Sequence, residues 1–138
     1  MEVNGKCACG QVKFAVNGEP MAQFYCHCHS CQTAHAAPMI AAAIFPATAV
    51  TYTGDVARVS VTGRQDAAQR LVCQQCGTKV MAEPRPGLRA VMVSLCESRD
   101  WFRPQMHLQW ADRMVDVQDQ LPKFLDFPEP FGGSGKQA

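Results

Sequence analysis

The spacing of the cysteines is the feature that most constrains this chain. Eight cysteines occur among 138 residues, and seven of them fall into three short groups. These groups are a C-x-C at Cys7 and Cys9, a C-x-C-x-x-C at Cys26, Cys28 and Cys31, and a C-x-x-C at Cys73 and Cys76. Thiolates one to three residues apart on a tight turn can face one ion, so the pattern predicts zinc sites.

Counting ligands pairs the groups. A structural zinc takes four protein ligands, and the two cysteine pairs, Cys7 with Cys9 and Cys73 with Cys76, supply four. A glycine follows each pair, which suits loops that need a positive φ. We therefore expect these four cysteines to hold a structural zinc; the alternative is four unrelated buried thiols.

The remaining group, Cys26, Cys28 and Cys31, is one ligand short of a closed tetrahedron. Three protein ligands with an exchangeable fourth position are typical of a zinc site that binds a ligand or does chemistry. A closed second zinc site remains an alternative, and a redox or disulfide role is a weaker one. The candidate fourth ligands are His27, His29, His35 and Cys96.

The charge of three thiolates decides which chemistry an open site favours. They make the ion's surroundings net negative, so a soft thiol suits the fourth position better than water does. The hypothesis is that a thiol substrate binds as thiolate and adds to a small electrophilic carbon such as an aldehyde, or leaves it. His27 or His29 could shuttle the proton or donate a hydrogen bond to a thiolate.

Two other cysteine and histidine positions are given structural roles. Cys96 ends an apolar run and is expected to pack as a small hydrophobic residue. His107 stands between Met106 and Leu108, which favours a histidine in the core or at its rim.

The amino-terminal segment indicates a reducing compartment. Residues 1–7 lack the basic and apolar regions of a secretory signal, so we expect a cytoplasmic protein, where clustered cysteines more often bind metal than form disulfides. The apolar stretch 36–50 is interrupted by Pro38 and Pro46 and is shorter than the roughly 20 residues that span a bilayer. We expect no membrane association.

The composition of the chain limits which fold classes and binding partners remain. With 47% apolar residues and a net charge of +1, the chain has enough material for a core and no basic excess for binding nucleic acid. The short alternating segments predict a mainly β domain, with strands near 12–16, 39–45, 50–53, 56–61, 71–73, 79–82 and 88–95. Helix stays open for 39–45, one helical turn is expected at 98–102, and no other helical stripe precedes residue 97. The chain from Leu121 onward is predicted to be an extended strap.

The motifs together resemble the glutathione-dependent formaldehyde-activating enzyme family, which includes the centromere protein V domain. The resemblance rests on the segments Gly5–Phe14, Cys26–Cys31 and Cys73–Thr78, in this order, with Pro104 to Leu108 and Leu121 to Phe124 as closing elements. It implies a β-tent fold similar to Mss4-like zinc proteins, in one domain over 1–130 with a disordered Gly-rich tail at 131–138.

The resemblance also implies ligands and an activity. Cys7, Cys9, Cys73 and Cys76 match structural zinc ligands, and Cys26, Cys28 and Cys31 match catalytic-type zinc ligands, which gives two Zn²⁺ sites. The implied activity is a carbon–sulfur lyase type that joins glutathione and formaldehyde into S-hydroxymethylglutathione. The segment 94–98 departs from the family pattern, and the tryptophan usual after the Pro-x-x-His element is missing near Met114. These departures bear on the substrate.

Two hypotheses of different classes follow. The first is the zinc-dependent enzyme with a small thiol substrate such as glutathione. The second is a non-catalytic, Mss4-like binding module in which both metals are structural; a metal-responsive or redox-sensing protein is a third. The fourth ligand of the zinc at Cys26, Cys28 and Cys31 separates the first two. The sequence indicates no oligomeric state.

Overall fold

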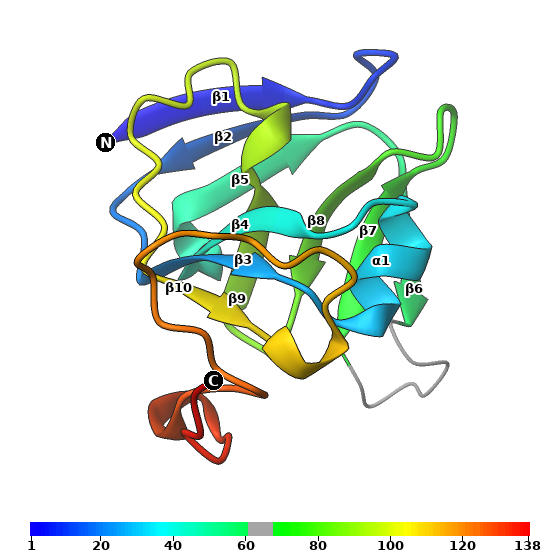
Figure 1. The fold of residues 1–138 in the computed structure, drawn as a ribbon. Coiled ribbons are helices and arrows are strands. Elements are labelled where there is room, and N and C mark those ends of the chain that lie inside the picture. Colours follow the sequence, from blue (N-terminus) through cyan, green and yellow to red (C-terminus); the bar gives the residue numbers. More distant parts are fainter. Residues whose placement is uncertain (61–67) are drawn as a thin grey trace. The chain divides into compact units, whose positions relative to one another are not determined.

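The computed structural model describes residues 1–60 and 68–138, and it confirms the predicted mainly β class (Figure 1). The chain divides into two compact units. Unit 1 comprises residues 1–22 and 43–102, and unit 2 comprises residues 23–42 and 103–138. Each unit contains one of the cysteine clusters, and each is described separately below.

Unit 1 contains a three-stranded antiparallel sheet in the order β1-β2-β5 (Figure 1). Its strands are β1 (Glu2–Lys6), β2 (Lys13–Asn17) and β5 (Val50–Thr53). Alternate residues are buried in β1 and β2, and Val3 pairs with Val16 in the register. This period of two comes from the strand geometry and places the valines of both strands in the core.

A second run of antiparallel strands in unit 1 has the order β9-β8-β7-β6. These strands are β6 (Val56–Ser60), β7 (Gln69–Cys73), β8 (Lys79–Glu83) and β9 (Leu88–Met92). Leu71, Val80 and Val91 are fully buried and form part of the core. The register of β7 against β8 shifts between Leu71 and Val72, just before β7 ends at Cys73 and the turn begins.

Unit 2 is built around a short parallel pair of strands. Nearly all of β3 (Ala22–Cys26) lies in this unit, and β10 (Met106–Leu108) runs parallel to it, with Leu108 opposite Cys26. A seven-residue helix, α1 (His29–His35), follows, and β4 (Ile40–Pro46) begins in unit 2 and ends in unit 1.

The carboxy-terminal chain runs along β10. His107 donates its N–H to the carbonyl of Pro122 at 2.9 Å, and the N–H of Phe124 returns a bond to the carbonyl of His107 at 3.0 Å. The last residues turn back, because a bridge pairs Phe124 with Gln137. The disorder predicted for 131–138 in solution stays a prediction, as does the 1–130 domain.

Short 3-10 turns connect these elements. They are η1 (Ala47–Ala49), η2 (Val93–Leu95), η3 (Trp110–Asp112) and η4 (Glu129–Phe131). The strand expected over 88–95 ends at Met92 because η2 begins at Val93. At 98–102 the chain forms a hydrogen-bonded turn, with Phe102 donating to the carbonyl of Arg99 at 3.0 Å, instead of a helical turn.

The remaining strand predictions compare directly with the structure. The segment expected over 39–45 forms the strand β4 from Ile40 onward, so the helical alternative is wrong. Val61, the last residue of the strand expected over 56–61, lies outside the described residues. Helix α1 was missed, because none of its residues is buried and it therefore leaves no apolar stripe in the sequence. None of the helices in 1–60 and 68–138 has the length and apolar character that crossing a membrane requires.

Candidate metal centres

The four-cysteine cluster is formed by two similar turns in unit 1. Cys7 and Cys9 lie in the turn between β1 and β2, and Cys73 and Cys76 lie in the turn between β7 and β8. In each turn the main-chain carbonyl of the first cysteine accepts a hydrogen bond from the N–H of the glycine that follows the second cysteine. Gly10 donates to the carbonyl of Cys7 at 3.1 Å, and Gly77 donates to the carbonyl of Cys73 at 2.9 Å. Both glycines have positive φ, 81° and 78°, as the sequence predicted.

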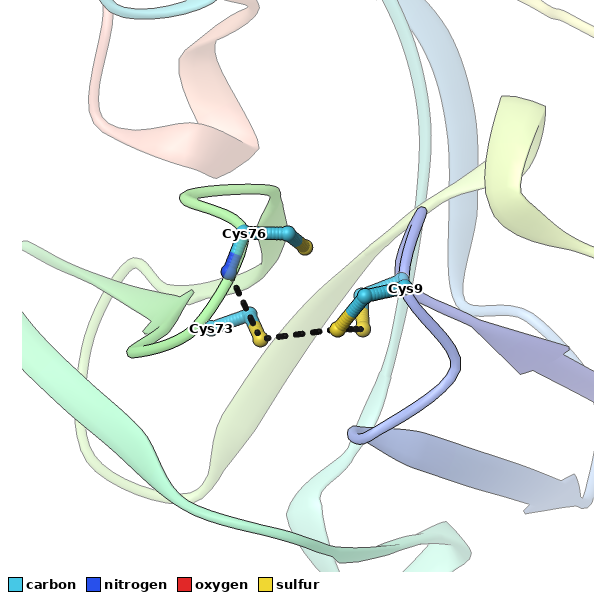
Figure 2. Close-up of side chains that lie close together, drawn as sticks. Cys9, Cys73 and Cys76 are labelled. Carbon is cyan, nitrogen blue, oxygen red and sulfur yellow. Dashed lines mark hydrogen bonds between the residues drawn. The ribbon is translucent and has the colours of Figure 1, made fainter.

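The sulfurs of this cluster converge from the two turns. The distances are 3.6 Å from Cys7 Sγ to Cys9 Sγ and 3.8 Å from Cys9 Sγ to Cys73 Sγ. Figure 2 shows Cys9 facing Cys73 across the gap between the turns, with Cys76 beside Cys73. The structure therefore brings together the four residues that ligand counting paired, and all four ligand atoms lie within 4.8 Å of one another.

Main-chain donors surround these sulfurs. Val12 donates its N–H to Cys7 Sγ at 3.3 Å, and Cys76 donates its N–H to Cys73 Sγ at 3.5 Å (Figure 2). Thr78 joins the turns, because its Oγ1 accepts from the N–H of Ala8 and lies 3.1 Å from Cys76 Sγ. Hydrogen bonds from the side chain and N–H of Thr78 lower the pKa of Cys76 to about 5. Such donors stabilise thiolates, the form that binds metal.

These dimensions fit a metal ion and exclude disulfides. A zinc ion at the centre of a tetrahedron with bonds of about 2.3 Å separates its sulfurs by about 3.8 Å. The two distances given above, 3.6 and 3.8 Å, agree with that spacing. A disulfide needs sulfurs about 2.05 Å apart, and all eight cysteines are free. The cluster can therefore bind a metal ion.

The three-cysteine cluster forms where β3 meets α1 in unit 2. Cys26 ends the strand, Cys28 is the N-cap residue of the helix, and Cys31 lies in the first helical turn. Cys28 Sγ accepts from the N–H of Cys31 at 3.3 Å, and Ser30 Oγ lies 3.3 Å away. Hydrogen bonds from Cys26 and Cys31 lower the pKa of Cys28 well below its usual range.

This cluster contains three ligand atoms. Cys31 Sγ lies 4.0 Å from Cys26 Sγ, and all three sulfurs lie within 4.8 Å of one another. Within the described residues, no histidine, cysteine or carboxylate joins them as a fourth ligand atom. His29 and His35 therefore do not complete the set, and Cys96 is buried in unit 1. The residues present can hold a metal ion with one position left for another ligand.

His27 stands between two of these cysteines and leads into a chain of hydrogen bonds. Its Nε2 lies 2.8 Å from His107 Nδ1, and His107 Nε2 lies 2.8 Å from Asp119 Oδ2. Lys123 Nζ donates to Asp119 Oδ1 at 2.8 Å. We call Lys123, Asp119, His107 and His27 the imidazole chain. Both histidines are fully buried, so the prediction of a core or rim position for His107 is confirmed.

The charges along the imidazole chain follow from its surroundings. Burial, together with electrostatic contributions from the neighbouring His107 and Arg113, lowers the pKa of His27 to about 4, so this imidazole is neutral near pH 7. Partial burial raises the pKa of Asp119, but hydrogen bonds from Lys123 and His107 outweigh it and lower the pKa to about 2. Asp119 is therefore a carboxylate throughout the physiological range.

Sequence reasoning missed Asp119 and Lys123 because nothing in their spacing links them to the cysteines. They lie more than eighty residues after Cys31 and reach the site only through the strap along β10. The other predicted histidine, His29, is exposed at the start of α1, and its N–H lies 3.4 Å from Asp112 Oδ2. The one sequence signal that pointed to the imidazole chain was the histidine inside the apolar triplet Met106 to Leu108.

Comparison with known proteins gives a family match over most of the chain. The model of the glutathione-dependent formaldehyde-activating enzyme family matches residues 2–112. A protein of Penicillium rubens, named "Putative glutathione-dependent formaldehyde-activating enzyme", is 26% identical over 125 residues. The match covers 87% of this chain and 64% of that protein, so the chain spans under two thirds of the relative's length.

A solved structure shares the fold. The crystal structure of a Rhodobacter sphaeroides protein matches with a TM-score of 0.54 and 21% sequence identity, over 69% of this chain and 88% of that chain.

Proposed function

The chain belongs to the glutathione-dependent formaldehyde-activating enzyme family, and from this premise we propose that it is a zinc-dependent carbon–sulfur lyase. A small thiol, glutathione or a close analogue, adds at the three-cysteine cluster to a small aldehyde such as formaldehyde, or the adduct breaks down in reverse. The observation that carries the proposal is the set of three converged sulfurs with no fourth protein ligand among the described residues.

The charge of the cluster explains the choice of a thiol. Cys26, Cys28 and Cys31 contribute three negative charges when deprotonated, which disfavours a hard anionic ligand such as hydroxide. A zinc ion bound there would keep a thiol ligand deprotonated and nucleophilic near pH 7. The N–H of Cys31 and the hydroxyl of Ser30 lie beside Cys28 Sγ and help to hold it as thiolate.

The reaction balances without a further reagent. The substrate sulfur forms a bond to the aldehyde carbon, and the carbonyl π electrons move to oxygen. That oxygen gains one proton, which equals the proton lost by the thiol. Nothing is oxidised or reduced, so the net change is the addition of a thiol to an aldehyde, giving a hydroxymethyl thioether from formaldehyde.

Proton movement is assigned to the two histidines beside the ligands. His29 is exposed at the first residue of α1, so its imidazole is in contact with solvent. His27 is buried and neutral near pH 7, with its Nε2 bound to His107. We propose that either residue serves as the proton shuttle, and that His29 has the better access to water.

The four-cysteine cluster is proposed as a structural zinc site. Its ligands come from turns whose cysteines are 64 residues apart in the case of Cys9 and Cys73. Bound zinc would tie the β1-β2 turn to the β7-β8 turn, and all four positions would be filled by protein. Such a site stabilises the fold and offers no position to a substrate.

The test is an exchange experiment on the purified, metal-loaded protein. Two-dimensional exchange NMR with ¹³C-formaldehyde and glutathione measures how fast the adduct forms and breaks down. We expect a rate that saturates with glutathione and rises with protein concentration. Cys28→Ser should abolish the acceleration, whereas Cys96→Ala, which removes a thiol outside both clusters, should retain it.

The outcome that contradicts the proposal is also defined. Protein carrying two zinc ions that leaves the exchange rate unchanged with glutathione and with other small thiols would exclude the lyase. That result would favour the alternative in which both metals are structural and the chain is a binding module.

A further inference from the structure

The side chain of Gln32 makes two hydrogen bonds beside the three-cysteine cluster. Its Nε2 donates to the main-chain carbonyl of His27 at 2.7 Å and to the main-chain carbonyl of Asp112 at 2.9 Å. An amide nitrogen carries two N–H groups, so these two bonds use both of them. Gln32 therefore links the stretch that carries the three cysteines to a segment 80 residues further along the chain.

The two carbonyls determine which way round the amide lies. Both are acceptors, so the nitrogen of the Gln32 side chain faces them and Oε1 points away. Turning the amide over would place its oxygen against two carbonyl oxygens and would lose both bonds. The contact thus has one favourable arrangement.

The first of these carbonyls belongs to the peptide unit that leads into Cys28. The N–H of His27 donates to the carbonyl of Leu108 at 3.0 Å, so both main-chain polar groups of His27 are paired. A peptide unit is planar, so holding its carbonyl also holds the direction in which the chain enters the next residue. Gln32 therefore acts, through the main chain, on the position of the Cys28 sulfur.

Gln32 also lies in the helix that carries Cys31. It follows Cys31 directly, and its own N–H donates to the carbonyl of Cys28 at 3.0 Å. Its side chain returns from the helix to the carbonyl of His27, a separation of five residues. Cys28 and Cys31 lie within the loop that this bond closes, and Cys26 directly precedes it. One side chain thus braces the whole segment that supplies the ligands.

The second carbonyl, that of Asp112, ends a turn that other contacts hold in place. Trp110 donates its N–H to the carbonyl of Phe124 at 2.9 Å, and Ala111 donates its N–H to the carbonyl of Leu125 at 3.2 Å. Trp110 is also buried. The turn η3 is therefore fixed to the carboxy-terminal strap, and it gives Gln32 a rigid partner.

Asp112 contacts the same helix a second time. Its Oδ2 lies 3.4 Å from the N–H of His29, the first residue of α1. The first N–H groups of a helix lack partners within the helix, and a carboxylate beside them is favourable. Asp112 thus receives bonds from two residues of α1, His29 and Gln32, which together hold the helix start against η3.

The cluster needs support of this kind because its ligands are few and alike. Three thiolates repel one another, and the described residues supply no fourth ligand atom to close the set. All three ligands also come from one short stretch of chain, so distant segments hold them only through the groups around them. Such surrounding hydrogen bonds commonly contribute about tenfold to a hundredfold to metal affinity.

We propose that Gln32 is a positioning residue of the three-cysteine cluster. Its amide ties the carbonyl of His27 to that of Asp112, and so keeps the three sulfurs at the spacing that a bound metal ion requires. The effect on metal binding does not depend on the reaction. The effect on activity rests on the proposed function.

The first test measures metal binding without substrate. Protein loaded with ¹¹³Cd²⁺, a soft ion that binds thiolates, should give one NMR signal for each cluster, so a chelator titration follows both sites in one sample. Gln32→Leu removes both hydrogen bonds and retains a good helix former. We expect EDTA to deplete the three-cysteine signal at a concentration about tenfold to a hundredfold lower than in the wild type, with the four-cysteine signal unchanged.

Two further variants sharpen this test. Gln118→Leu is the matched control, because it removes an amide in the same unit that donates to a main-chain carbonyl, that of Asp116, at 3.3 Å. It should keep both wild-type midpoints. Gln32→Asn keeps the amide but shortens the side chain by one methylene, so it can reach one carbonyl at most. It should weaken the site less than Gln32→Leu, and it serves if that variant does not fold.

The result that overturns the proposal is a three-cysteine signal in Gln32→Leu with the wild-type EDTA midpoint. If Gln32→Leu lowers only the melting temperature and leaves that midpoint unchanged, Gln32 is merely structural and the proposal is wrong. Equal weakening in Gln118→Leu would also contradict it, because the effect would then not belong to the tie between His27 and Asp112.

The second test concerns activity. We expect the exchange of glutathione and formaldehyde by Gln32→Leu to fall at limiting free Zn²⁺ and to recover in excess Zn²⁺, as a loss of metal affinity requires. A wild type that does not accelerate this exchange overturns the proposed function, and the ¹¹³Cd²⁺ signals still decide the role of Gln32. An active wild type with an unchanged midpoint in Gln32→Leu keeps the function and removes this inference.

Discussion

The two cysteine clusters use the same ligand chemistry in different local settings. The four-cysteine cluster joins two turns, and its contact between Cys9 and Cys73 closes a separation of 64 residues. The three-cysteine cluster occupies one stretch from a strand end into a helix, and Cys26 and Cys31 are five residues apart. The first cluster joins distant parts of unit 1, and the second fixes only a short segment of unit 2.

Closing a long loop lowers the entropy of the unfolded chain more than closing a short one, so the two clusters should stabilise the fold to different extents. By the loop-closure estimate used for disulfides, cross-linking a 64-residue loop stabilises the fold by about 4 kcal/mol, against about 2 kcal/mol for a five-residue loop. The four-cysteine cluster also supplies every ligand from protein, whereas the three-cysteine cluster leaves one position for another molecule. We infer that the first cluster stabilises the fold and the second carries the chemistry.

The largest expected effect is that of Cys73→Ser. It removes one of four ligands at a residue that is only 1% exposed, and structural zinc contributes about 10–16 kcal/mol to folding in small zinc domains. We expect no folded protein in the soluble fraction, measured by circular dichroism and zinc content. Folded Cys73→Ser protein of wild-type melting temperature would refute the structural assignment, and Cys96→Ala is the matched control.

Graded chelation compares the clusters in one sample. The open position of the three-cysteine cluster gives a chelator direct access, so we expect its metal to leave first, with loss of exchange activity and retention of the β signal in circular dichroism. The second metal should leave only as the protein unfolds. Simultaneous loss of both metals and of structure would show that the clusters do not differ in this respect.

Cys28→Ser should separate activity from stability. Serine is a good N-cap residue, so it can keep the bond from the N–H of Cys31 that Cys28 Sγ now accepts at 3.3 Å. We expect loss of one zinc ion, a fall in exchange rate of more than about 100-fold, and a loss of less than about 2 kcal/mol in unfolding free energy. Unfolding of Cys28→Ser as severe as that of Cys73→Ser would remove the distinction.

The smallest effect is expected from an ion-pair cluster in unit 1 that contains no cysteine. Burial raises the pKa of Glu83, but hydrogen bonds from Arg58 and Arg89 outweigh it and lower the pKa. Glu83→Gln should therefore cost about 1 kcal/mol at pH 7, measured by urea unfolding.

The sign of the pH dependence follows from the lowered pKa of Glu83. Its contribution is complete above the unfolded pKa of about 4.3 and is lost as pH falls below that value. The difference between wild type and Glu83→Gln should thus be constant from pH 8 to 5. A difference that changes within this range, or one equal to that of the exposed control Glu2→Gln, would contradict the assignment.

Much of the strand pattern could be predicted from the sequence because a strand shows itself in the order and type of its own few residues. The period of two in β2 and the β-branched residues of β5 marked both elements. Helix α1 left no such record, since a seven-residue helix with no buried residue has no apolar face. Its position follows from Cys28, which caps it as part of the cluster.

The sequence by itself determined which cysteines belong together, because ligands on one tight turn must be close in the chain and the number of ligands a metal takes is fixed. It also determined the family through the order of those motifs. Only the tertiary structure decided that His27 connects through His107 to Asp119 and Lys123. The contact between His27 and His107 joins residues 80 positions apart, and the contacts depend on a parallel strand pair and a strap along it. Single residues that come together only in the folded protein form no short motif with a fixed spacing, so the sequence alone does not identify them.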